Sequence, residues 1–197
     1  FAAQAREVEK LLEGSGGEVN VVTVSGAGAT REKIKAAFES IAAAAKPADA
    51  VVLMLIGHGS YDGSAYKFNI PGPDLSGAEL AALCDRVPAG RQLVVNTTSA
   101  SGGSLEALQR PKRAVILATK AGTERNATVF AFYWVEALRD PAADTDKNEV
   151  VTALEAYRYA DRKTVEFYET NKRLATEHAV LEDTGAGEAV RAPSTAN

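Results

Sequence analysis

Residues 51–59 read Val-Val-Leu-Met-Leu-Ile-Gly-His-Gly, an apolar run that ends on a histidine between two glycines. A continuous apolar run bounded by turn residues is typical of a strand that is buried on both faces. Shorter apolar runs follow at 93–95, within a predicted strand at 92–96, and at 114–118, and helical patterns separate them. This alternation predicts an α/β fold, a sandwich in which helices cover both faces of a mainly parallel sheet. We expect a single domain over residues 1–183.

The strand at 92–96 leads into a cluster of small polar residues and glycines, Asn-Thr-Thr-Ser-Ala-Ser-Gly-Gly at 96–103. Functional loops gather at the carboxyl ends of parallel strands, and strands consecutive in sequence are commonly neighbours. We therefore expect His58 and Ser99 to lie at the same edge of the sheet. A histidine can take a proton near neutral pH, and a serine becomes nucleophilic when such a base removes its proton. The alternatives without a catalytic role are a hydrogen-bonded histidine at a strand end and a helix cap with an anion-binding turn at 97–103.

The remaining patterns place the other elements of the chain. They predict helices at 3–13, 76–86, 104–109 and 151–177, a helix that Thr30 caps and Pro47 ends, an aromatic-rich helix at 130–138, a strand at 19–24 and a small hairpin or loop at 60–73. Segment 184–197 is rich in Gly, Ala and Pro, and we expect a flexible C-terminal tail there.

Composition excludes several classes of protein. The chain has 197 residues, a net charge of −4 and no long apolar run, which argues against a nucleic-acid-binding surface and a transmembrane segment. Its one cysteine, Cys84, lies on the apolar face of a predicted helix, so we interpret it as a buried thiol. Residue 1 is Phe, which leaves open a trimmed start and a removed export signal. The sequence does not settle the oligomeric state.

The ordered set of motifs over residues 18–183 resembles the caspase–legumain superfamily of cysteine peptidases, and bacterial caspase-like domains in particular. In that superfamily a strand ends in His-Gly, and the next strand ends, about forty residues on, in an acid or glutamine, Ala and the catalytic Cys. Here Gly57-His58-Gly59-Ser60 is followed by Asn96-Thr97-Thr98-Ser99-Ala100-Ser101-Gly102. The resemblance implies a caspase-like three-layer sandwich. It also implies a first core strand before the helix at 3–13, which we expect to be missing from this chain.

The sequence departs from the family at the nucleophile, because Ser99 stands where the resemblance places the cysteine. An alternative register places Thr98 there. A hydroxyl ionises far less readily than a thiol, and no carboxylate that would orient His58 is identifiable from the sequence. We therefore expect a catalytically impaired peptidase homologue whose cleft between Gly59 and Ser99 holds a peptide or protein ligand.

Two alternatives stay open. One is an active endopeptidase that uses a Ser99–His58 pair, with the backbone N–H groups of Gly59 and Ser99 as the oxyanion hole. The other is a non-enzymatic assembly or regulatory domain that acts through an exposed sheet edge or the helix at 130–138.

The resemblance also indicates where a substrate side chain would bind. Thr97 takes the place of an acid that receives a basic side chain in metacaspase-like enzymes, and a threonine cannot supply that charge. Asp62, shortly after Gly-His-Gly, could supply one negative charge, although its position beside Gly63 favours a turn. In a pocket for basic residues formed by Thr97, Thr98 and Asp62, only Asp62 would supply a negative charge.

A calcium-loop spacing occurs at 144–155, where Asp144, Asp146, Asn148 and Glu155 fall at positions 1, 3, 5 and 12. Position 6, which needs a glycine for the sharp turn, is Glu149. The alternative is a solvated loop that caps the following helix, so the cofactor prediction is none, with Ca²⁺ as the ion to test. His178 is interpreted as a surface or packing residue.

Overall fold

The computed structural model of the chain describes residues 1–13 and 19–184, and its main sheet has four strands in the order β1-β5-β6-β7. Strands β1 (Ala50–Leu55), β5 (Arg91–Asn96) and β6 (Arg113–Leu117) are parallel, and β7 (Val180–Glu182) runs antiparallel to β6. The three parallel strands coincide with the three apolar runs of the sequence. The predicted α/β class and the mainly parallel sheet are therefore confirmed.

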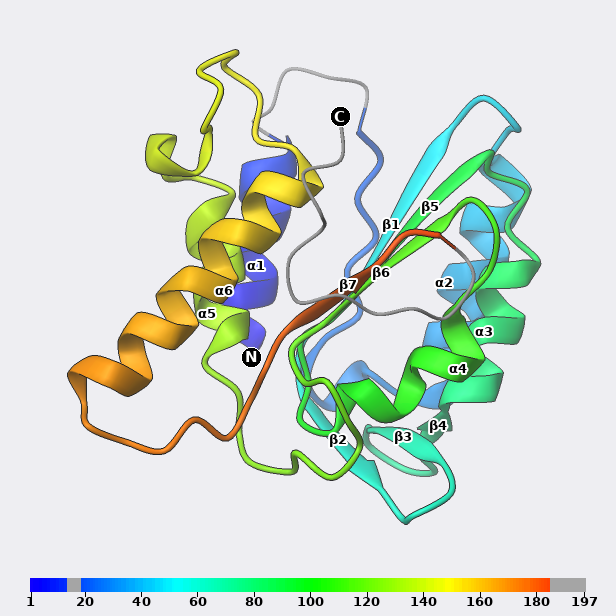
Figure 1. Cartoon of the computed structure of the whole chain (residues 1–197). Helices are drawn as coiled ribbons and strands as arrows, with labels where there is room; N and C mark the ends of the chain where they lie inside the picture. The colour runs from blue at the N-terminus through cyan, green and yellow to red at the C-terminus, as the bar shows by residue number, and fades with distance from the viewer. Residues whose placement is uncertain (14–18, 185–197) are drawn as a thin grey trace.

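Helices cover both faces of this sheet, which gives the molecule three layers (Figure 1). One layer holds α2 (Arg31–Ala44), α3 (Gly77–Asp85) and α4 (Leu105–Leu108), and the other holds α1 (Ala2–Glu13), α5 (Phe130–Ala137) and α6 (Ala153–Thr170). Two buried clusters match the two interfaces, one around Leu80 and Val94 and the other around Trp134 and Ile116. Short 3₁₀ turns occur at Gly26–Gly28, Ser101–Ser104 and Pro141–Ala143.

A small second sheet lies at the carboxyl end of β1, within the segment predicted as a hairpin or loop. It consists of β2 (His58–Tyr61), β3 (Tyr66–Asn69) and β4 (Leu75–Ser76), all antiparallel. Ser76 then caps α3 in a capping box with Glu79. This sheet begins at His58, so the histidine starts a strand rather than standing in a loop.

Two predicted elements are wrong in type or extent. Residues 19–24 form no strand, and Val19 and Val22 remain 46% and 43% exposed. Apolar alternation makes a strand only where a neighbouring strand offers backbone partners, and in the described part of the chain these residues find none. The helix predicted at 151–177 ends at Thr170, and the unpredicted strand β7 follows.

The remaining expectations about the ends of the chain are not tested by the structure. The expected tail from residue 185 onward lies outside the described residues. Within the described ranges, every helix is too short or too polar to span a bilayer.

Candidate functional site

The carboxyl ends of β1 and β5 lie side by side, as expected from their order in the sequence. Leu55 is paired with Asn96, and the backbone N–H of Thr97 continues the ladder to the carbonyl of Leu55 at 3.0 Å. The segments that leave the two strands, 57–61 and 97–104, therefore start next to each other. This edge is the place at which the candidate site was predicted.

The hydroxyl of Ser99 is bonded to the backbone of Gly59 in both directions. Ser99 Oγ donates to the carbonyl oxygen of Gly59 at 2.9 Å and accepts the N–H of Gly59 at 3.3 Å. The contact is so close that a Cβ on Gly59 would lie 2.4 Å from the Ser99 carbonyl oxygen and 2.5 Å from Thr98 Oγ1. Only glycine fits there. Ser99, 5% exposed, thus fastens the first residues of β2 to the end of β5.

The imidazole of His58 is in a different environment, because it is exposed to solvent. Its ring meets the ring of Phe1 edge-on, with the centroids 4.7 Å apart. Within the described part of the chain, no hydrogen bond joins His58 to Ser99. Gly59, the third predicted member of the site, uses its N–H to bond Ser99. The three residues are brought together, but not as a hydrogen-bonded catalytic pair.

The threonines before Ser99 belong to a buried polar cluster. Thr97 Oγ1 donates to the carbonyl of Leu55 at 2.8 Å, and Thr98 Oγ1 donates to the Asn96 side chain at 2.8 Å. The hydroxyl of Tyr66 lies 2.8 Å from Thr98 Oγ1, and burial raises the pKa of Tyr66 to about 12. Neither threonine faces solvent, since their exposed fractions are 1% and 0%. Their hydroxyls serve the packing of the strand end.

Asp62 forms a turn, as its sequence context favours. Its Oδ1 accepts the N–H groups of Ser64 and Ala65, and its Oδ2 lies 3.3 Å from the ammonium of Lys67. The two backbone N–H groups, that of Ala65 foremost, lower the pKa of Asp62. Asp62 does not line the groove described next.

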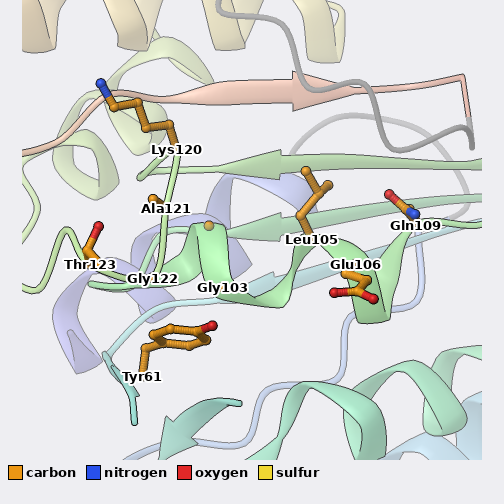
Figure 2. A pocket seen from close by; sticks show the side chains of 10 residues that line it. Tyr61, Gly103, Leu105, Glu106, Gln109, Lys120, Ala121, Gly122 and Thr123 are labelled. Atoms are coloured by element: carbon orange, nitrogen blue, oxygen red, sulfur yellow. The ribbon is translucent and has the colours of Figure 1, made fainter. Parts of the chain in front are cut away.

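A groove of about 540 Å³ lies along the turn that follows Ser99, and Figure 2 shows the residues that line it, among which His58, Gly59 and Ser99 are not found. One wall is the turn after β5, and the other is the loop at 120–123 after β6. The two walls meet at Gly103 and Gly122, and the ring of Tyr61 packs against both glycines, since a Cβ on Gly103 or Gly122 would approach ring atoms within 2.6 Å and 2.4 Å. The full lining comprises Tyr61, Gly102, Gly103, Leu105, Glu106, Gln109, Lys120, Ala121, Gly122 and Thr123. Three of these ten residues are glycines, and the exposed ones are Glu106, Lys120 and Thr123.

Sequence reasoning missed the residues that build this groove. The wall after β5 depends on Ala100, which has a φ of +56° and donates its N–H to the carbonyl of Glu124 at 2.7 Å. Ser101 and Thr119 join the two walls through their hydroxyls, 3.1 Å apart. The packing of Gly103 and Gly122 against each other and against Tyr61 is a tertiary contact, which leaves no local signal in the sequence.

The acidic loop brings together three of its four predicted ligands. Ligand oxygens of Asp144, Asp146 and Glu155 all lie within 4.8 Å of one another, so the triad could hold a metal ion. Asn148 instead donates its N–H to Asp144 and Asp146. Glu149 has a φ of +67°, the left-handed conformation for which a calcium loop uses glycine.

Glu155 has a structural role that accounts for both of its oxygens. Oε2 accepts the backbone N–H of Thr152 in a capping box at the start of α6, and Oε1 accepts the N–H and hydroxyl of Thr145. These bonds, that from the Thr152 N–H first, lower the pKa of Glu155 to about 2. The loop is thus held by hydrogen bonds to the helix cap.

Comparison with protein-family models finds no match for this chain, and comparison with curated proteins finds none either.

Proposed function

We propose that this chain is a peptide-binding domain related to the caspase–legumain peptidases and that it does not cleave its ligand. The motif order at 57–60 and 96–102 supports the relationship, and the three-layer fold is compatible with it. The observation that carries the proposal is the reciprocal bonding of Ser99 Oγ to Gly59. A nucleophile needs a free hydroxyl beside a base, and here the hydroxyl is bonded to backbone while the histidine faces solvent.

The groove that follows the turn after β5 is the proposed binding surface. It is open, it lies near the edge at which the family places its cleft, and it carries the exposed side chains of Glu106, Lys120 and Thr123. A few polar groups placed along a groove can orient a ligand such as an extended peptide through hydrogen bonds to its backbone. The proposed ligand is therefore an extended peptide segment.

Peptide binding is tested with a library of fluorescein-labelled octapeptides and fluorescence anisotropy. Thr123→Trp places an indole at the exposed rim of the groove and should abolish binding, whereas Thr170→Trp at the exposed end of α6 should leave it unchanged. No binding by any peptide, or equal binding by the two variants, would overturn the proposal.

Cleavage is tested with the same library on wild type, Ser99→Ala and Ser99→Cys. We expect no cleavage by wild type or Ser99→Ala. Activity that appears only in Ser99→Cys would support a preserved cleft that lacks its nucleophile. Cleavage by wild type that is lost in Ser99→Ala would establish the alternative, an endopeptidase that uses Ser99 and His58.

We propose assembly through the β1 edge as a second candidate function. Val52 is 51% exposed, strand β1 carries no charged residue, and within the described ranges no strand pairs with its outer side. An uncharged open edge favours pairing with another strand. Light scattering tests this candidate: a dimer that becomes monomeric in Val52→Lys would support it, and a monomeric wild type would exclude self-assembly.

For the acidic loop we propose Ca²⁺ as the ion to test. Calorimetric titration of wild type should then give heat at or below about millimolar Ca²⁺, the range of weak extracellular sites. Asp146→Asn should remove that heat. No heat in wild type would leave the loop as the helix cap described above.

A further inference from the structure

Besides the Ser101–Thr119 contact, Glu124 connects the two walls of the groove. Its backbone carbonyl accepts the N–H of Ala100 at 2.7 Å, and its Oε2 accepts the N–H of Lys120 at 2.9 Å. Ala100 begins the turn after β5, and Lys120 begins the loop after β6. Because Ala100 has a left-handed φ, which L-residues adopt at a cost, its turn needs such an external bond to persist.

A third segment joins Glu124 from the other end of the chain. The backbone N–H of His178 donates to Glu124 Oε2 at 3.2 Å, and Nδ1 of the same histidine contacts Oε1. The Glu124 and His178 side chains are 13% and 24% exposed, so this ion-pairing contact is shielded from solvent on most sides. His178 lies two residues before β7. Glu124 thus contacts the chain after β5 through its backbone carbonyl, and its carboxylate joins Lys120, after β6, to His178, before β7.

We propose that Glu124 and His178 are positioning residues for the groove and that protonation of His178 tightens its walls and strengthens peptide binding. The peptide part of this inference rests on the proposed function. A neutral imidazole can donate from Nδ1 to the carboxylate, and a protonated one makes a charge-assisted bond, which is shorter and stronger. A more firmly held Glu124 side chain fixes Lys120 directly and fixes the backbone of its own loop, whose Glu124 carbonyl accepts the N–H of Ala100. A preorganised groove binds its ligand more tightly.

The other charged groups near His178 do not replace Glu124 as its partner. Glu177, the preceding residue, is buried and accepts the N–H groups of Val129 and Phe130 at the start of α5, together with the hydroxyl of Tyr168. The ammonium of Lys120 belongs to an exposed side chain that points away from Glu106 in Figure 2. Burial, with a contribution from Glu124, raises the pKa of Glu177, so Glu177→Gln is the variant that separates a response of Glu177 from that of the His178–Glu124 contact.

The coupling can be measured without a peptide, by ¹⁵N–¹H NMR of the whole chain between pH 8 and pH 5. The chain contains only two histidines, so His58→Gln is a matched control for His178→Gln. In wild type and His58→Gln, the amide signals of Gly102, Gly103 and Gly122 should shift with the same midpoint as the His178 ring. In His178→Gln that shift should vanish. Glycine amides that ignore the His178 ring would overturn the inference.

The consequence for binding is measured with octapeptides that lack histidine and acidic residues and carry a tetramethylrhodamine label in place of fluorescein, so that neither the peptide side chains nor the label titrate in this range. Affinity should rise as the pH falls from 8 to 5.5, and it should be roughly threefold lower in Glu124→Gln because a neutral amide loses the charge-assisted bonds. Unfolding curves of each variant establish that it is folded, and His178→Asn supplies a second variant if one fails to fold. If no peptide binds while the glycine amides follow His178, the proposed function fails and the positioning role stands. If peptides bind with no dependence on pH or on Glu124, the effect on binding is overturned.

Discussion

The segments that follow β1 and β5 begin side by side but differ in burial and in hydrogen bonding. After β5, residues 96–101 are almost completely buried, and the side chains of Asn96, Thr97, Thr98, Ser99 and Ser101 are all hydrogen-bonded. After β1, His58 is exposed and its described contact is the ring of Phe1. A motif names residue types, but their chemistry depends on which partners hold them. Here the serine is part of the packing, and the histidine is available to solvent.

The largest expected effect comes from Gly59→Ala, which forces the two segments apart. The new Cβ would lie 2.4 Å from the Ser99 carbonyl oxygen, so backbone must move. Overpacking of this kind lowers the free energy of unfolding by about 3 kcal/mol. Denaturant titration measures the loss. Gly28→Ala is the control, since a Cβ there meets nothing within 4 Å; equal losses in both variants would contradict the close fit.

Ser99→Ala removes the hydroxyl that joins the two segments. It leaves both backbone groups of Gly59 without this partner, and we expect a loss of about 1–2 kcal/mol in the free energy of unfolding. The control is Ser64→Ala, whose hydroxyl bonds Asp62 in an exposed turn. Wild-type stability in Ser99→Ala would show that the hydrogen bonds between Ser99 and Gly59 do not stabilise the fold.

Tyr66→Phe tests the buried side of the comparison. Removal of the hydroxyl leaves Thr98 and Asn96 without their bonds to Tyr66 and should lower the free energy of unfolding by about 1 kcal/mol.

The same variant has a pH signature. The folded pKa of Tyr66, about 12, lies above the usual value of 10.0, so its contribution to stability is complete below pH 10 and is lost as the pH rises toward 12. Over that range the free energy of unfolding should therefore fall less steeply with pH in Tyr66→Phe than in wild type. An equal fall in the two proteins would contradict the assignment of this pH dependence to Tyr66.

His58→Ala should have the smallest effect on stability. An exposed ring with one aromatic contact leaves the free energy of unfolding within about 0.5 kcal/mol of wild type. The same denaturant titration measures it beside Ser99→Ala. A larger loss in His58→Ala than in Ser99→Ala would reverse the comparison between the two segments.

The main elements of the fold could be predicted because their signals are local. The apolar runs of β1, β5 and β6 and the cap of α3 at Ser76 are each readable from a few neighbouring residues. Strand β7 could not be, because three residues are too few to show a period. Residues 19–24 had the right pattern but no partner strand, which no local pattern reveals.

The candidate site also has one part that could be predicted from the sequence and one that could not. The meeting of His58 and Ser99 at one edge followed from the order of the strands, since consecutive parallel strands are neighbours. The bonding of Ser99 to Gly59 did not, because it depends on the left-handed turn at Ala100, which Glu124 holds from a different loop. Long-range contacts of this kind decide whether a hydroxyl reacts or packs.

The double role of Glu155 has a consequence for how this chain folds. Its carboxylate bonds Thr145 on one side and the first turn of α6 on the other, so loop and helix start share one anchor. We therefore expect the loop and the start of the helix to open together. Hydrogen exchange should accordingly give the amides of Thr145 and Thr152 the same opening free energy, as members of one cooperative unit.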